Sequence, residues 1–315
     1  MGAYIIRRLL YVIPIVIGVS LLLFLLFNYL GKDPALVMAG KHATPERIAE
    51  IRTELGLDRP ILVQFGDYLR QVATFDFGRS FSNRQLISDI IWNGMWPSLS
   101  LALPAFSMTL MMSITIALMV AYFRGRALDR IIVILCVMGM SIPSLAFILF
   151  GQYFLAYKLP EYIGIELFPI SGYDMSFPWP YVILPAIIWV SVSLGTDVRF
   201  FRTAILDETH QDYVRTARAK GLSEQVVFFK HVLKNSMIPI LTYVVIQIPF
   251  LIMGTLLLEN FFGIPGLGSI LIDALNTEDL PVIKAVATIS CLFLIAGTLM
   301  TDILYSVVDP RVSLK

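Results

Sequence analysis

Charged residues are scarce in this chain of 315 residues, where Asp, Glu, Lys and Arg make up 15% and hydrophobic residues 57%. Soluble domains are about 25% charged and roughly 45–50% apolar. The mean hydropathy of +0.77 points the same way. This composition excludes an ordinary soluble domain and predicts an integral membrane protein. The net charge of +1 gives no indication of nucleic-acid binding.

Cysteine and histidine are also rare, with two and three residues. Cys136 and Cys291 lie in apolar runs without metal-ligand spacing, so we interpret them as buried apolar side chains. The histidines are dispersed, at His42, His210 and His231, and predict no metal site. The sequence lacks a G-x-x-x-x-G-K-[ST] phosphate loop, an H-E-x-x-H motif and a G-x-S-x-G motif. We therefore predict no catalytic residues, no cofactor bound by this chain and no enzymatic activity.

Long apolar runs are abundant. Six reach the length of about 20 residues that a membrane helix needs, namely 9–30, 98–123, 131–157, 181–203, 236–258 and 283–308. We expect an all-α membrane protein with six transmembrane helices, several of them kinked at proline. The first run follows two arginines, as a secretory signal would, but it is too long and lacks a cleavage site. We expect a retained anchor helix there.

The distribution of basic residues predicts the orientation. With both termini in the cytoplasm, seven basic residues between Arg199 and Lys234 fall on the cytoplasmic side. The short loops 158–180 and 259–282, on the opposite side, carry one Lys and seven acidic residues between them. The expected topology therefore has both termini inside.

Residues 31–97 then form an external lobe. Thr44-Pro45-Glu46 is a typical helix start, with Thr44 as the cap, and Gly56 is a typical stop. A second helix is predicted from Ile61 to Ala73 because its apolar residues recur at helical spacing. Two roles remain open for this lobe: a structural cap on the outer mouth, or a contact for an external delivery protein.

A polar, basic segment, DYVRTARAKG at residues 212–221, interrupts the apolar chain on the cytoplasmic side. On a helix, its residues divide between a smooth face and a basic face. The smooth face carries Tyr213, Ala217 and Gly221, and the basic face carries Arg215, Arg218 and Leu222. Such a helix could dock in a partner's groove or lie on anionic lipid head groups. Gly221 is expected to end it, and Ser223 to cap a second helix.

The segment 259–268, ENFFGIPGLG, lies in an outer loop. Its glycine order does not fit a dinucleotide-binding loop. Glycines and a proline among apolar residues instead predict a re-entrant turn in a protein-lined vestibule. The turn could be an outer gate, a contact with a binding protein or a packed connector. Its candidate residues are Glu259, Phe262, Gly263, Pro265, Gly266 and Gly268.

Four charged residues fall near the cytoplasmic ends of predicted spans: Asp197, Arg199, Arg202 and Asp302. They could form structural ion pairs or a substrate relay. No acidic residue lies in the middle of a predicted span, and no inverted repeat is evident. Both observations argue against a proton-coupled carrier.

Several segments resemble a known family. The stretch DYVRTARAKGL followed by Ile238-Pro239 resembles the cytoplasmic loop of permease subunits in bacterial ATP-binding-cassette importers, specifically the dipeptide/oligopeptide branch. Further similar segments occur in order along the chain: Arg7-Arg8-Leu9 with Pro14, Leu57-Asp58-Arg59-Pro60-Ile61, Asp76-Phe77-Gly78-Arg79-Ser80, the segment 259–268 and Asp309-Pro310-Arg311.

Two features depart from the wider family's pattern. Arg215-Thr216-Ala217 stands where that pattern has Glu-Ala-Ala, and the 18 residues from Gly221 to Pro239 exceed its spacing. The longer spacing is typical of the peptide branch.

The resemblance implies a type I importer permease fold. Residues 1–94 would form the first transmembrane helix and the extracytoplasmic lobe, 95–308 a five-helix transmembrane domain, and 309–315 a cytoplasmic tail. It also implies that the cytoplasmic segment is a coupling helix seated in a cleft of an ATPase subunit. The matching residues are Asp212, Tyr213, Arg215, Thr216, Ala217, Arg218, Lys220 and Gly221.

The resemblance further implies partners in the bacterial inner membrane: a homologous second permease, two ATP-binding subunits that use ATP and Mg, and an extracytoplasmic solute-binding protein. The chain would then form half of a translocation path for peptides. Nickel, glutathione and oligosaccharides are alternative substrates in that branch. A self-contained channel or secondary carrier, whose basic loop binds lipid, is the alternative of a different class.

Overall fold

The computed structural model describes the chain except for residues 1, 31–32, 41–42, 253–254 and 309–315. The predicted tail 309–315, with Asp309-Pro310-Arg311, lies outside the described residues, as does the side chain of Asp302. The described residues form helices and loops, with one isolated bridge between Arg79 and Leu86 and no sheet. The predicted all-helical class is confirmed.

Five helices are long and apolar enough to cross a membrane, and they match five of the six predicted spans. They are α1 (Gly2–Leu25) with the π-helical turn η1 (Leu26–Leu30), α5 (Ile87–Tyr122), α9 (Trp179–Thr209), η3 (Val227–Val232) with α12 (Leu233–Ile252), and α15 (Leu280–Val308). Large apolar side chains such as Leu22 and Met111 are exposed on them. Such surfaces suit lipid or a partner subunit rather than water.

The third predicted span, 131–157, is not one continuous helix. α6 (Ala127–Met140) and the stretch made by α7 (Ser144–Gly151), η2 (Gln152–Lys158) and α8 (Leu159–Ile163) meet at 93°. Pro143 lies at the break, where it lacks a backbone N–H and disfavours a helical conformation at Ile142. A second pair, α13 (Leu256–Phe262) and α14 (Leu267–Asn276), bends by 78°. The described helices therefore offer five to seven candidate spans.

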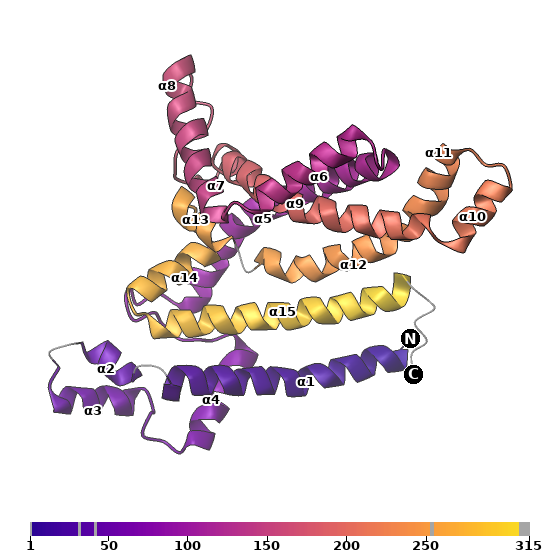
Figure 1. Ribbon diagram of the computed structural model, residues 1–315. Coiled ribbons are helices and arrows are strands. Elements are labelled where there is room, and N and C mark those ends of the chain that lie inside the picture. The colour runs from indigo at the N-terminus through magenta and orange to yellow at the C-terminus, as the bar shows by residue number, and fades with distance from the viewer. Residues whose placement is uncertain (1, 31–32, 41–42, 253–254, 309–315) are drawn as a thin grey trace.

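α5 and α9 pack along each other at the centre of the bundle (Figure 1). Small side chains allow close approach between helices, and Ala102 and Ala117 of α5 are fully buried. α6 joins α9 in the same way, since a Cβ atom at Gly195 would lie 2.7 Å from the carbonyl oxygen of Cys136. Cys136 is buried and Cys291 half-buried, and neither forms a disulfide.

The lobe contains α2 (Pro34–Ala39), α3 (Pro45–Glu54) and α4 (Ile61–Thr74). As predicted, Thr44 caps α3, since its hydroxyl accepts a hydrogen bond of 3.4 Å from the Arg47 amide. α4 follows the predicted course and is attached to α15 by a buried hydrogen bond of 2.6 Å between Tyr68 and Thr288. The lobe is thus joined to the bundle through its second long helix.

A buried carboxylate makes a second attachment. Asp279, immediately before α15, accepts hydrogen bonds from the backbone amides of Phe81 at 3.1 Å and Ser82 at 3.2 Å. The hydroxyls of Ser80 and Ser82 also donate to it. The segment between the lobe and α5 is therefore held against the start of α15.

The long helices run between two ends of the bundle, and the shorter elements lie at one end or the other (Figure 1). The lobe, α13–α14 and the start of α15 occupy one end, which we call the lobe end. The beginning of α1, α10 (Asp212–Ala219), α11 (Glu224–Val226) and the last turns of α15 occupy the other, which we call the α10 end.

Candidate functional site

The polar segment 212–221 forms a short helix, α10, beyond the end of α9. Val214 is fully buried and Ala217 is 6% exposed, in a cluster with Phe201 of α9 and Phe228 of η3. The helix is thus packed on its own chain through two side chains one turn apart. Gly221 then turns the backbone at φ +80°, a conformation that favours glycine.

Tyr213 fixes the entry to α10. Its hydroxyl donates a hydrogen bond of 2.6 Å to the carboxylate of Glu208, at the end of α9. Burial, together with this hydrogen bond, raises the pKa of Tyr213 to about 12. The phenol therefore stays protonated at neutral pH and keeps donating to Glu208.

The outward side of α10 is charged. The side chains of Asp212 and Arg215 are 96% and 77% exposed, and they approach to 3.5 Å. Arg218 makes two hydrogen bonds, of 2.8 and 3.1 Å, to Glu224 of α11, which link the two short helices across the turn. The hydroxyl of Thr216 bonds to the Asp212 carbonyl at 3.0 Å, and Lys220 follows the helix as an exposed residue.

The orientation of α10 differs from the predicted arrangement. The smooth face was expected to be available to a partner, but Tyr213 and Ala217 are turned towards α9 and η3. Gly221 lies beyond the last turn, with open space where a Cβ atom would be. Ser223 takes the predicted N-cap position of α11 without a side-chain capping bond. A partner would therefore meet the charged side, because the apolar side is already covered.

An ion pair lies near the α10 end. Arg202 of α9 donates hydrogen bonds of 2.9 and 3.0 Å to the two carboxylate oxygens of Asp129 in α6. The Gly125 amide donates to Asp129 at 2.8 Å. Sequence reasoning singled out Arg202 but missed Asp129, the sole acidic residue in the turn RGRALDR at 124–130. A lone acidic residue among three arginines was the sequence signal that could have identified Asp129 as an ion-pair partner.

The other charged residues of the spans have separate contacts. Asp197 accepts a hydrogen bond of 2.6 Å from Tyr243 of α12, and Arg199 contacts the sulfur of Met140 at 3.7 Å. Together with the Asp129–Arg202 pair, these contacts favour a structural role over a relay. Among the described residues, no group of three His, Cys, Asp or Glu side chains could hold a metal ion.

A second candidate site is the turn between α13 and α14, where Glu259 is fully buried. Its carboxylate accepts hydrogen bonds from the Ser98 hydroxyl of α5 at 2.8 Å and from the Gly268 amide at 2.7 Å. The amides of Thr255 and Ser269 donate at 3.1 and 3.3 Å. Four donors compensate the burial of the carboxylate. The Ser98 hydroxyl also accepts a hydrogen bond of 2.8 Å from the Leu267 amide, so it links both α13 and the start of α14 to α5.

Two glycines of the turn are required by close packing. A Cβ atom at Gly268 would lie 2.5 Å from the Cα atom of Leu256, and one at Gly266 would lie 2.5 Å from the hydroxyl of Ser98. Pro265, between Ile264 and Gly266, is exposed. The turn is thus compact on its inner side.

The same turn joins the loop before α9. Gly263 ends α13 at φ +64°, and the carbonyl of Phe262, itself buried, accepts a hydrogen bond of 2.8 Å from the Gly172 amide. The side-chain amide of Gln152 in η2 donates to the carbonyls of Phe261 and Ile170, both at 2.9 Å. Both η2 and the loop before α9 are therefore attached to the α13–α14 turn.

Comparison with known proteins accounts for nearly the whole chain. Residues 113–314 match the family of binding-protein-dependent transport system inner membrane components, and residues 1–102 match the N-terminal region of such membrane components. The chain is 37% identical over 322 residues to a protein of Brucella abortus (strain 2308), with the provisional name of a peptide transport system permease protein. It is 35% identical over 314 residues to the glutathione transport system permease protein GsiC of Salmonella typhimurium (strain LT2). Each alignment covers 99% of both chains.

Proposed function

This chain belongs to the family of binding-protein-dependent transport system inner membrane components, and from that premise we propose that it forms half of the path by which an ATP-driven importer moves peptides across the bacterial inner membrane. It is a multi-pass permease component rather than an enzyme. Within the proposal, the lobe end faces outward and the α10 end faces the cytoplasm. The distribution of basic residues supports that orientation.

We propose α10 as the helix through which an ATPase subunit drives transport. The observation that carries this proposal is the division of α10 into a buried anchor, Val214 and Ala217, and an exposed charged side with Asp212 and Arg215. A force on the exposed side reaches α9 and η3 directly, because the anchor packs on both. ATP and Mg would be bound by the partner subunits.

The α13–α14 turn is proposed as part of an outer gate. The proposal is supported by the position of Glu259, whose hydrogen bonds link α13 to α5 and to α14. Because of these bonds, a movement of the central helix α5 would also move the turn. A homologous second permease would complete the path, two ATP-binding subunits would act at the α10 end, and a solute-binding protein would deliver substrate at the lobe end.

Peptides are the proposed substrate because a relative at 37% identity carries a peptide transport name. Glutathione is a second candidate, since a relative at 35% identity is named for glutathione transport and glutathione is itself a small peptide. Uptake of labelled dipeptides and of labelled glutathione, each with the cognate binding protein, separates the two.

Purification with the partner subunits tests the function. The gently solubilised chain should carry an ATPase and a second permease, and proteoliposomes should take up peptide only with ATP and the binding protein. Uptake by the chain alone, without ATP, would instead support a self-contained channel or secondary carrier.

A further inference from the structure

A cavity of about 340 Å³ lies where the lobe meets the ends of α1 and α15. Asn28 of η1 and Lys284 in the second turn of α15 contribute to its lining, together with Gln71 of α4 and Arg79 of the following loop. Its apolar walls include Phe27 and Leu280. The cavity is thus amphipathic, with cationic and amide groups beside apolar walls.

Lys284 is the distinctive residue of this cavity. Its ammonium group lies 4.1 Å from the centre of the Tyr68 ring and 5.6 Å from that of Phe24, and donates a hydrogen bond of 3.2 Å to the Asn28 side chain. Among the described residues, no carboxylate forms an ion pair with it. An ammonium group has three N–H donors, so the contacts leave donors available for an anion in the cavity.

The charges of the lining favour an anion as well. Arg79 and Lys284 are cationic, and Glu54 is the one acidic residue that lines the cavity. One guanidinium nitrogen of Arg79 donates to the Arg84 carbonyl at 2.9 Å, and the group has further donors. The lining therefore has a net positive charge at neutral pH.

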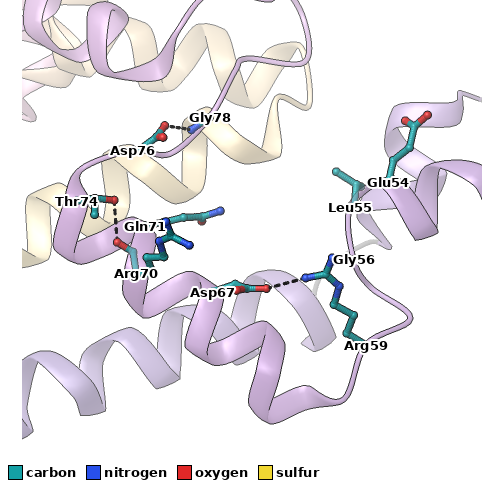
Figure 2. A pocket seen from close by; sticks show the side chains of 10 residues that line it. All are labelled: Glu54, Leu55, Gly56, Arg59, Asp67, Arg70, Gln71, Thr74, Asp76 and Gly78. Carbon is teal, nitrogen blue, oxygen red and sulfur yellow. Dashed lines mark hydrogen bonds and ion pairs between the residues drawn. The ribbon is translucent and has the colours of Figure 1, made fainter.

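A second, more polar hollow of about 470 Å³ adjoins the cavity (Figure 2). The two share Glu54, Leu55, Gln71 and Gly78. The second hollow lies within the lobe, where the ion pair of Arg59 and Asp67 spans 3.3 Å. Figure 2 shows that its lining residues come from α3, α4, the loop between them and the loop after α4. A polar group in the first cavity would therefore have a hydrophilic region on one side.

The level of the cavity along the membrane-spanning stretches indicates the source of the anion. Asn28 and Lys284 belong to apolar stretches that can cross a membrane, Arg7–Tyr29 and Leu280–Met300, and both lie near the lobe end of those stretches. Phosphate head groups lie at the boundary of the apolar layer, and a lysine near a helix end can reach them. A lipid phosphate fits this depth better than a freely dissolved anion.

We propose that the cavity between the lobe and the ends of α1 and α15 binds the phosphate of an anionic membrane lipid through Lys284, with Asn28 and Arg79 as further donors. The apolar walls then contact the upper part of the acyl chains. The bound lipid joins the lobe to the bundle, beside the Tyr68–Thr288 hydrogen bond.

Native mass spectrometry of the full chain in detergent, titrated with phosphatidylglycerol or phosphatidylcholine of identical acyl chains, tests this site. We expect tighter binding of phosphatidylglycerol to wild type. Lys284→Met should weaken that binding about tenfold, as loss of one charge-assisted contact predicts, whereas Lys284→Arg should retain most of it. Lys158→Met is the matched control, because Lys158 is also at the lobe end but is exposed and paired with Glu161.

Equal binding of the two lipids to wild type would overturn the proposal, and this comparison needs no variant. An unchanged affinity in Lys284→Met would overturn it too. Inorganic phosphate distinguishes the source: if millimolar phosphate displaces phosphatidylglycerol completely, the site recognises a free anion rather than a lipid head group.

Discussion

Asp129 and Arg202 are 73 residues apart in the chain, yet their side chains form a doubly hydrogen-bonded ion pair that joins α6 to α9. Arg202 belongs to α9, and α10 follows the end of that helix. It therefore fixes the helix that would transmit motion from an ATPase subunit in the proposed mechanism.

Removing one partner of this pair should destabilise the protein. Asp129→Asn leaves the Arg202 guanidinium without its carboxylate in a largely buried position, and breaking such pairs costs about 3 kcal/mol. Thermal unfolding in detergent should show a clearly lower Tm. Glu50→Gln, which breaks the exposed Arg47–Glu50 pair, should leave the Tm within error. An equally stable Asp129→Asn variant would contradict a structural role for the pair.

Glu259→Gln should loosen the α13–α14 turn. An amide can supply one acceptor oxygen in place of two, so at least one buried backbone N–H loses its partner, at a cost of about 2 kcal/mol. A cysteine placed at exposed Pro265 would report the change as faster labelling by a water-soluble maleimide. Glu161→Gln, at an exposed acid of the same end, is the control. Identical labelling rates would show that the carboxylate does not hold the turn.

Gly268→Ala should be destabilising because the added methyl group meets the Leu256 backbone. Overpacking of this kind costs about 1–3 kcal/mol. Gly139→Ala, in α6 with nothing within 4 Å of the added atom, should be neutral or slightly stabilising. Tm values of both variants, measured side by side, check the difference. If they coincide, the turn can relax without cost.

Gly221→Leu should reduce the coupling of ATP hydrolysis to uptake, because a branched side chain is strained at φ +80° and the α10–α11 turn would change shape. Asn tolerates this conformation better, so Gly221→Asn should retain most of the coupling. The measurement is the ratio of peptide uptake to ATP hydrolysed in proteoliposomes. Equal ratios in the two variants would rule out the backbone conformation as the cause.

The attachment of the loop 78–86 to α15 should weaken in acid. Burial opposes ionisation of Asp279, but its hydrogen bonds from Ser80, Phe81 and Ser82 outweigh burial and lower its pKa. Its stabilising contribution is therefore present above the ordinary Asp pKa of about 3.9 and is lost as pH falls through the lowered value. Protection of the Phe81 and Ser82 amides against hydrogen exchange, measured relative to the intrinsic exchange rate at each pH, should fall as the pH drops below the ordinary Asp pKa of about 3.9. Asp279→Asn should show low protection at every pH.

Local sequence features predicted much of this fold. Apolar length located five spans, and Thr44 with Gly56 bounded α3, because those signals depend on neighbouring residues alone. A kink at proline was expected, but the angle of 93° at Pro143 was not, because the angle depends on what α7 packs against. Likewise, the sequence of α10 shows two faces but does not show which one α9 and η3 will cover.

Contacts between side chains far apart in the sequence could not be predicted from local sequence patterns. Glu259 was a candidate because of the glycine-rich motif around it, but its partner Ser98 lies 161 residues away. Asp129 belonged to no motif and was marked only as the sole acidic residue among the arginines of 124–130. Lys284 lies in an apolar run, and its contacts with Tyr68 and Asn28 arise only when the lobe folds against α1 and α15.

The inward position of Val214 and Ala217 bears on how such a permease could change partners during evolution. Substitutions at Asp212 and Arg215 alter the charges offered at the surface without disturbing the side chains that hold α10 in place. If α10 is the ATPase contact that we propose, a few exposed replacements would match it to a new ATPase. Exchange of these exposed residues between paralogous importers would then be expected to reassign their ATPase subunits while leaving each membrane domain intact.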